Sequence, residues 1–114
     1  MRAAIIPADP TQPIHVEDIE DNYRALGAVV GGFIETVGAQ AIAAAMYINE
    51  EGKMQGLARN DRATLVANVS CSIRSTDYIA GDAVLLGLYD DEGNDTDLPL
   101  ASIALLGDLT GCSI

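Results

Sequence analysis

Residues 43–69, AAAMYINEEGKMQGLARNDRATLVANV, constrain the fold more than any other part of the chain. The small apolar run 41–48 ends in β-forming residues, which favours a strand over a helix. Residues 49–52, Asn-Glu-Glu-Gly, then predict a turn with a glycine available for a positive φ. Residues 53–57 are expected to return as the partner strand.

A capped helix follows this predicted hairpin. Asn60 or Asp61 can accept hydrogen bonds from the first free amides of a helix. The apolar positions of that helix recur at helical spacing and predict its inner face; they are Ala63, Leu65, Val66 and Val69. The stretch therefore predicts strand, turn, strand and helix in succession.

A long amphipathic helix is predicted over residues 18–37. Its apolar residues recur at steps of three and four: Ile19, Tyr23, Leu26, Val30, Phe33, Ile34 and Val37. Acidic residues open it, and Gly38 is the expected C-cap. Gly27, Gly31 and Gly32 each weaken a helix by about 1 kcal/mol relative to Ala, which indicates close packing on a sheet.

The remaining elements complete an α+β pattern. Strands are predicted over residues 2–6 and 14–17, and a central strand over residues 83–89. Pro99 suits the first turn of a last helix, with Gly107 ending it. We expect one compact α+β domain over residues 1–114, with a mixed or antiparallel four- to five-stranded sheet packed against one long and one or two short helices.

Composition and charge exclude several classes of protein. A hydrophobic fraction of 49% argues against disorder, and no apolar run reaches the roughly 18 residues of a membrane span. The N-terminus lacks the apolar core of a signal peptide, which predicts a cytoplasmic protein. A net charge of −11 opposes direct nucleic-acid binding. Two cysteines and a lone His15 give no metal or cofactor motif.

The basic residues are unevenly placed. Residues 53–74 hold Lys53, Arg59, Arg62 and Arg74 with a single acid, Asp61, whereas every charged residue after Arg74 is acidic. Because a helix N-terminus favours anions, this strip is the candidate ligand-binding site. The predicted site residues are Lys53, Arg59, Asn60, Arg62 and Thr64. The competing interpretation, which the many acids favour, is that Asn60 is only a cap and the basic side chains form internal ion pairs.

Two acidic segments are weaker candidates. Glu50 and Glu51 could perform acid–base chemistry if burial separated their pKa values, but adjacent turn residues are normally solvated. Residues 90–97, DDEGNDTD, place Asp95 where a calcium-binding EF-hand loop needs glycine. A solvated acidic loop is therefore expected over 90–97.

Several short motifs together resemble a small domain family of unknown function found in bacteriophages and their actinobacterial hosts. The matching segments cover most of the chain: the opening IIPA, VGGFIE, YINEEGK, RNDRAT with the RAT helix start, and GDAV. The resemblance implies a phage context and no established chemistry.

We therefore expect a non-catalytic, phage-type accessory protein that binds a host protein or sequesters a small anionic, nucleotide-like ligand. The main alternative is an acidic DNA mimic that inhibits a host nucleic-acid-binding or defence enzyme through the carboxylates of residues 77–97. A small hydrolase or transferase using Glu50 or Glu51 is the weaker alternative. A homodimer that buries Leu100, Ile103 and Leu106 is also predicted.

Overall fold

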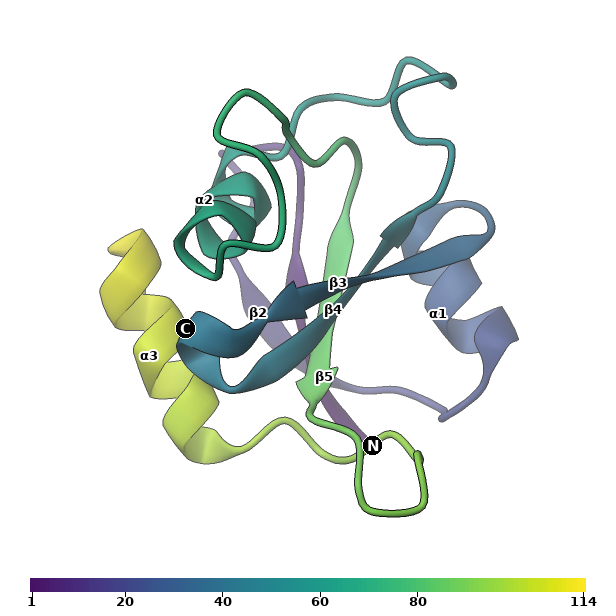
Figure 1. The fold of residues 1–114 in the computed structure, drawn as a ribbon, viewed down its shortest axis with the longest axis vertical. Helices are drawn as coiled ribbons and strands as arrows, with labels where there is room; N and C mark the ends of the chain where they lie inside the picture. The colour runs from purple at the N-terminus through teal and green to yellow at the C-terminus, as the bar shows by residue number, and fades with distance from the viewer.

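A five-stranded sheet in the order β2-β1-β5-β4-β3 runs through the middle of the molecule (Figure 1). The computed structural model describes residues 1–114. All four strand pairings are antiparallel, which confirms the predicted α+β class. The elements are β1 (Arg2–Ile6), β2 (His15–Asp18), α1 (Tyr23–Val30), β3 (Ile34–Ala39), η1 (Gln40–Ile42), β4 (Ala44–Asn49), α2 (Asp61–Val69), β5 (Ala83–Gly87) and α3 (Leu100–Thr110).

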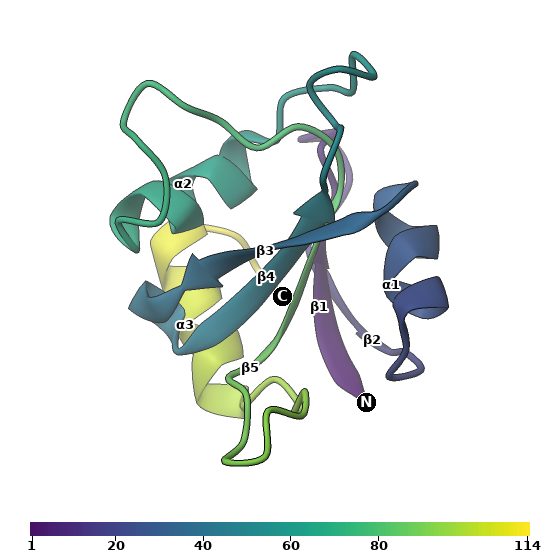
Figure 2. The ribbon, with the colours of Figure 1, turned by 45° about the vertical axis from the view of Figure 1, so that its right-hand side comes forward.

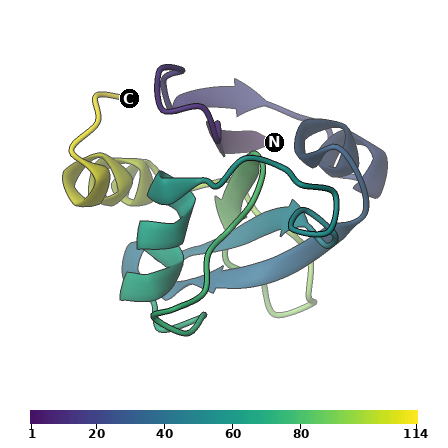
Figure 3. The same ribbon diagram turned by 90° about the horizontal axis from the view of Figure 1, so that it is seen from above.

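Helices cover both faces of this sheet. α2 and α3 lie together on one face and α1 lies on the other (Figures 1 and 2). Seen from above, the strands separate the two helical layers (Figure 3). None of the helices is long and apolar enough to cross a membrane.

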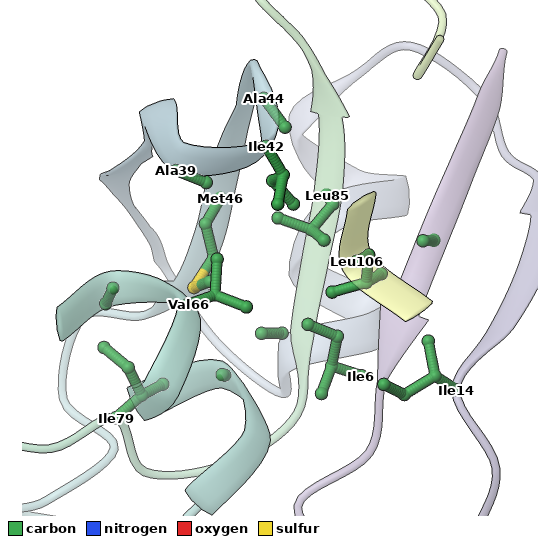
Figure 4. Close-up of a cluster of buried hydrophobic side chains, with 14 of the residues drawn as sticks. Ile6, Ile14, Ala39, Ile42, Ala44, Met46, Val66, Ile79, Leu85 and Leu106 are labelled. Carbon is green, nitrogen blue, oxygen red and sulfur yellow. The ribbon is translucent and has the colours of Figure 1, made fainter. Parts of the chain in front are cut away.

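Each sheet face has its own hydrophobic core. Successive strand side chains point to opposite faces, so a strand covered on both sides must be apolar throughout. β5 meets this condition, because all five of its residues are buried, as expected for a central strand. The core under α2 and α3 includes Ile6, Met46, Leu85 and Leu106 (Figure 4). The core under α1 includes Leu26, Val30, Tyr47, Val84 and Leu86.

The helix predicted over 18–37 is wrong in extent. α1 has eight residues and ends at Gly31, which adopts the left-handed conformation with φ 81° and whose amide donates to the Gly27 carbonyl. Residues 34–39 form β3 instead, so Gly38 lies in a strand and caps no helix. Gly27 and Gly32 allow the chain to turn back closely, since a Cβ on Gly27 would lie 2.9 Å from the Gly32 carbonyl oxygen.

The predicted hairpin partner of β4 is also wrong. Residues 50–56 form consecutive turns and no strand, and β4 pairs with β3, which precedes it. The β3–β4 connection uses η1 and then Ala43, a non-glycine residue with φ 53°.

The helix faces agree with the sequence only in part. Ala63 and Val66 of α2 are buried as predicted, whereas Leu65 is 40% and Val69 49% exposed. α3 continues to Thr110, three residues beyond Gly107, and ends at Gly111. Leu106 is fully buried in the core of its own chain and Ile103 packs against that core. The predicted homodimer therefore cannot use Leu106 as an interface residue.

Phe33 provides a test of where α1 ends. As a residue of a long buried helix it would cost about 3–5 kcal/mol on truncation, but in the structure it is 79% exposed. We expect Phe33→Ala to lower the free energy of unfolding in urea by less than about 1 kcal/mol. The matched control is Leu85→Ala, whose side chain is fully buried and whose loss should cost about 2–5 kcal/mol. Equal losses for the two variants would show that the Phe33 side chain is buried, as in the long helix predicted over 18–37.

Candidate functional site

Two of the predicted site residues, Asn60 and Thr64, are buried inside the fold. The Asn60 amide nitrogen donates to the carbonyls of Ile6 (2.8 Å) and Gly81 (3.0 Å), and its oxygen accepts from the Ala63 amide (3.0 Å). The Thr64 hydroxyl donates to the Asn60 carbonyl and accepts from the Ile79 amide. Asn60 thus caps α2 as predicted, and both side chains have their hydrogen-bonding capacity occupied within the protein.

The Arg62 guanidinium donates hydrogen bonds to backbone carbonyls of its own chain. One of its terminal guanidinium nitrogens, Nη2, lies 2.8 Å from the carbonyl oxygen of Pro7, 3.2 Å from that of Asp9 and 2.8 Å from that of Gln12. The guanidinium therefore fixes the turn between β1 and β2.

Lys53 and Arg59 converge on one aromatic ring. The Lys53 ammonium lies 4.8 Å and the Arg59 guanidinium 5.2 Å from the centre of the Tyr78 ring, within the range of cation–π attraction. Lys53 also pairs with Asp77 and lowers the pKa of that carboxyl through their hydrogen bond. Arg59 pairs with Asp61 at 2.7 Å. The structure thus brings Lys53 and Arg59 together, each with a carboxylate partner.

Most carboxylates have no such partner. Ion pairs engage four of the 17 acidic residues: Asp18, Glu17, Asp77 and Asp61. The acidic loop 90–97 is a tight turn, in which the Asp90 carboxylate accepts from the amides of Glu92 and Asn94 at 2.9 Å. Glu50 and Glu51 are exposed. The surface outside the basic strip therefore keeps a strong negative charge.

A free strand edge is the feature that sequence reasoning missed. β3 is the last strand of the sheet. The Phe33 carbonyl accepts from the Glu50 amide of the neighbouring chain segment. Because backbone groups alternate along an antiparallel strand, Glu35 and Val37 also point toward β4, while Ile34 and Thr36 point outward. Gly38 is in phase with Ile34 and Thr36, and its carbonyl accepts a hydrogen bond from the Ser72 hydroxyl at 2.6 Å, away from β4. This contact confirms that the backbone groups of these alternate residues point outward.

The opposite edge of the sheet is less suited to pairing. β2 has four residues, His-Val-Glu-Asp, and three of them are charged or titratable. Short strands with charged side chains are a common means of blocking edge pairing. β3 has six residues, Ile-Glu-Thr-Val-Gly-Ala, with one charge among them. β3 is therefore the more receptive edge.

Hollows lie on both sides of the β3 edge. The arginine hollow, of about 630 Å³, lies on the face of the sheet that α2 covers. Its walls are β3, the turn after β4 and the segment 72–80; among its lining residues are Glu35, Val37, Ile73, Arg74 and Tyr78. Arg74 is exposed and has no ion pair.

Two further hollows lie on the α1 side. The phenylalanine hollow, of about 750 Å³, lies at the start of β3 and is lined by Tyr23, Phe33 and Ile34 together with Glu50 and Glu51. Tyr23 is 81% and Phe33 79% exposed. The tyrosine hollow, of about 620 Å³, is lined by Ile34, Thr36, Tyr47, Tyr89 and Asp95, among others. All three hollows thus include residues of β3.

A polar network forms the floor of the tyrosine hollow. The Tyr47 hydroxyl lies 2.9 Å from that of Tyr89 and donates to Asp95. Burial, and then the hydrogen bond to Asp95, raises the pKa of Tyr47, so its hydroxyl stays protonated. Burial also raises the pKa of Asp21, which shares a hydrogen bond with Asp95. This network attaches the acidic loop to the sheet.

Arg62 and Arg59 make a matched pair for testing the basic strip, since both flank the start of α2. Arg62→Ala should reduce the free energy of unfolding by about 1–3 kcal/mol, because three backbone carbonyls lose a charged donor. Arg59→Ala should cost less than about 1 kcal/mol, since its ion pair with Asp61 is exposed. Urea unfolding of both variants measures the difference. Equal and negligible losses would show that the Arg62 contacts do not hold the turn and would return Arg62 to the ligand-binding candidates.

Comparisons with known proteins show a similar fold and identify the family. No curated protein matches the chain. Among solved structures, the crystal structure of the small RNA methyltransferase HEN1 is similar, with a TM-score of 0.63 and 15% identity. The match covers 93% of this chain and 16% of that chain, so the likeness concerns one region of a much longer protein and shows the fold alone. A family model described as a domain of unknown function, DUF3846, matches residues 1–110. The chain therefore belongs to the DUF3846 family, as its resemblance to a small family of unknown function predicted.

Proposed function

We propose that this chain is a non-catalytic binding protein that docks an extended segment of a partner protein along the free edge of β3. In the phage context implied by the sequence motifs, the partner is a host protein. The observation that carries the proposal is the outward direction of the Ile34 and Thr36 backbone groups, with hollows on both faces of that edge.

Strand addition supplies both affinity and specificity. Backbone hydrogen bonds to a sheet edge hold the added strand, while alternate side chains enter pockets on opposite faces. Here the side chain that lies opposite Glu35 in an added strand would enter the arginine hollow. The side chains immediately before and after it in the added strand would face the phenylalanine and tyrosine hollows. The Ser72 contact occupies the edge at Gly38, so the docked segment extends toward Phe33.

The anionic-ligand alternative has weaker support. Of the basic residues predicted to bind an anion, Lys53 and Arg59 have carboxylate partners and Arg62 binds three carbonyls. Binding an anion there would require breaking these contacts. The DNA-mimic alternative rests on acidity, and the hydrolase alternative rests on two exposed glutamates.

Thr36→Pro is the sharpest test of this proposal. Proline removes the outward amide of Thr36 and leaves the β3–β4 hydrogen bonds in place, and it is tolerated on edge strands where the N–H faces solvent. The matched control is Thr36→Ala, which shortens the side chain and keeps the amide. The probe is a displayed library of random dodecapeptides, selected on the unmodified protein.

We expect selected peptides to bind the unmodified protein and Thr36→Ala similarly, and Thr36→Pro at least about tenfold more weakly, a loss of about 1.4 kcal/mol. Methylating alternate amides of a selected peptide should reduce its binding with a period of two, because alternate amides of an added strand face β3. Peptides that bind Thr36→Pro as well as the unmodified protein would contradict the proposal.

Amide exchange provides a second measurement that does not depend on folding of the proline variant. The amides of Ile34 and Thr36 should exchange rapidly in the free protein and slowly with a peptide bound. Those of Glu35 and Val37, already paired with β4, should change little. Unchanged exchange at Ile34 and Thr36 in the peptide complex would place the binding surface elsewhere.

A further inference from the structure

The charges around the β3 edge indicate the chemistry of the docked segment. Glu35, Glu50 and Glu51 all line the arginine hollow, and the carboxylates of the three form no ion pair and accept no hydrogen bond. Lys53 and Asp77, in the same hollow, neutralise each other. Arg74 is the remaining positive charge. The walls of this hollow therefore keep an excess of negative charge.

The direction of the Glu35 side chain matters most. Glu35 shares a sheet face with Val37 and lies in the middle of the open edge, and its partner in β4 is Ile48. Directly opposite residues on adjacent strands bring their Cβ atoms to within about 5.5 Å, and opposite charges at such positions attract. A strand added outside β3 thus places one or two side chains beside Glu35 on the acidic face.

The other face of the same edge is more apolar. Ile34 is half-buried and packs against the core under α1. The exposed rings of Tyr23 and Phe33 lie at the start of β3. Side chains of an added strand on this face meet the aliphatic and aromatic surface of the phenylalanine hollow, whose lining also includes Arg24, Glu50 and Glu51. The carboxylates of Asp21 and Asp95 lie in the tyrosine hollow.

We infer that the docked segment is an extended stretch of a basic protein in which lysine or arginine alternates with apolar residues. The basic residues lie on the Glu35 face and the apolar residues on the Ile34 face. This inference rests on the proposed docking at β3 and adds the chemical class of the partner. The net charge of −11 attracts such a partner at long range, and the alternation fixes its register.

Three synthetic peptides of matched length test the pattern by fluorescence anisotropy. The first alternates lysine and valine, KVKVKVK. The second, KKKKVVV, has the same composition in two blocks, and the third, EVEVEVE, reverses the charge. We expect KVKVKVK to bind at least tenfold more tightly than either of the others, because charge without alternation cannot satisfy both faces of the edge.

Two charge-removing variants locate the effect. Glu35→Gln should weaken KVKVKVK binding by about three- to tenfold. The matched control Asp108→Asn removes the same charge from an exposed position on α3 and should change binding by less than twofold. Equal effects of the two variants, or equal binding of KVKVKVK and KKKKVVV, would reduce the attraction to non-specific charge and overturn the inference.

The outcomes for docking and for partner chemistry remain separate. If the library selects neutral or acidic peptides that bind the unmodified protein and fail on Thr36→Pro, docking at β3 stands and the basic-partner inference fails. If KVKVKVK binds Thr36→Pro as tightly as the unmodified protein, the docking proposal itself fails.

Discussion

The buried side chain of Asn60 is the interaction on which the arrangement of the elements depends. It is fully buried and caps α2 by accepting a hydrogen bond from the Ala63 amide. It also donates hydrogen bonds to two segments that are distant in sequence, the end of β1 and the turn before β5. Its backbone amide also donates to Ile79. Buried carbonyls left without donors cost about 1–3 kcal/mol each, so one amide side chain fixes where α2 meets the sheet.

The sequence predicted the elements whose local signals agree with their tertiary role. The apolar run of β5 indicates a strand buried on both faces, and Asn60 stands at a helix start as its residue type suggests. The helix prediction is wrong over residues 31–37 because Phe33, Ile34 and Val37 continue the apolar spacing of α1 beyond its end at Val30 and into β3. The return from β3 to β4 carries no turn motif, since Ala43 rather than glycine takes the left-handed conformation.

The candidate site was harder to predict than the fold. The strip of basic residues is evident in the sequence, but its partners are set by tertiary structure: Arg62 reaches carbonyls about 50 positions earlier, and Lys53 meets an acid 24 positions later. The free edge of β3 could not be found while residues 34–37 were assigned to a helix. The Gly31–Gly32 pair followed by Phe-Ile-Glu-Thr-Val is the available signal, because glycines end helices and aromatic and β-branched residues favour strands.

An open strand edge exposes a protein to pairing with its own copies, which is a route to aggregation. Two copies approaching through β3 would bring Glu35, Glu50 and Glu51 of each chain against those of the other. The repulsion between these carboxylates therefore opposes pairing of identical edges and leaves each edge uncovered. The same charge would attract the proposed basic partner, so salt, which screens charge over about 8–10 Å at 0.1–0.15 M, would weaken both the repulsion between copies and the proposed docking.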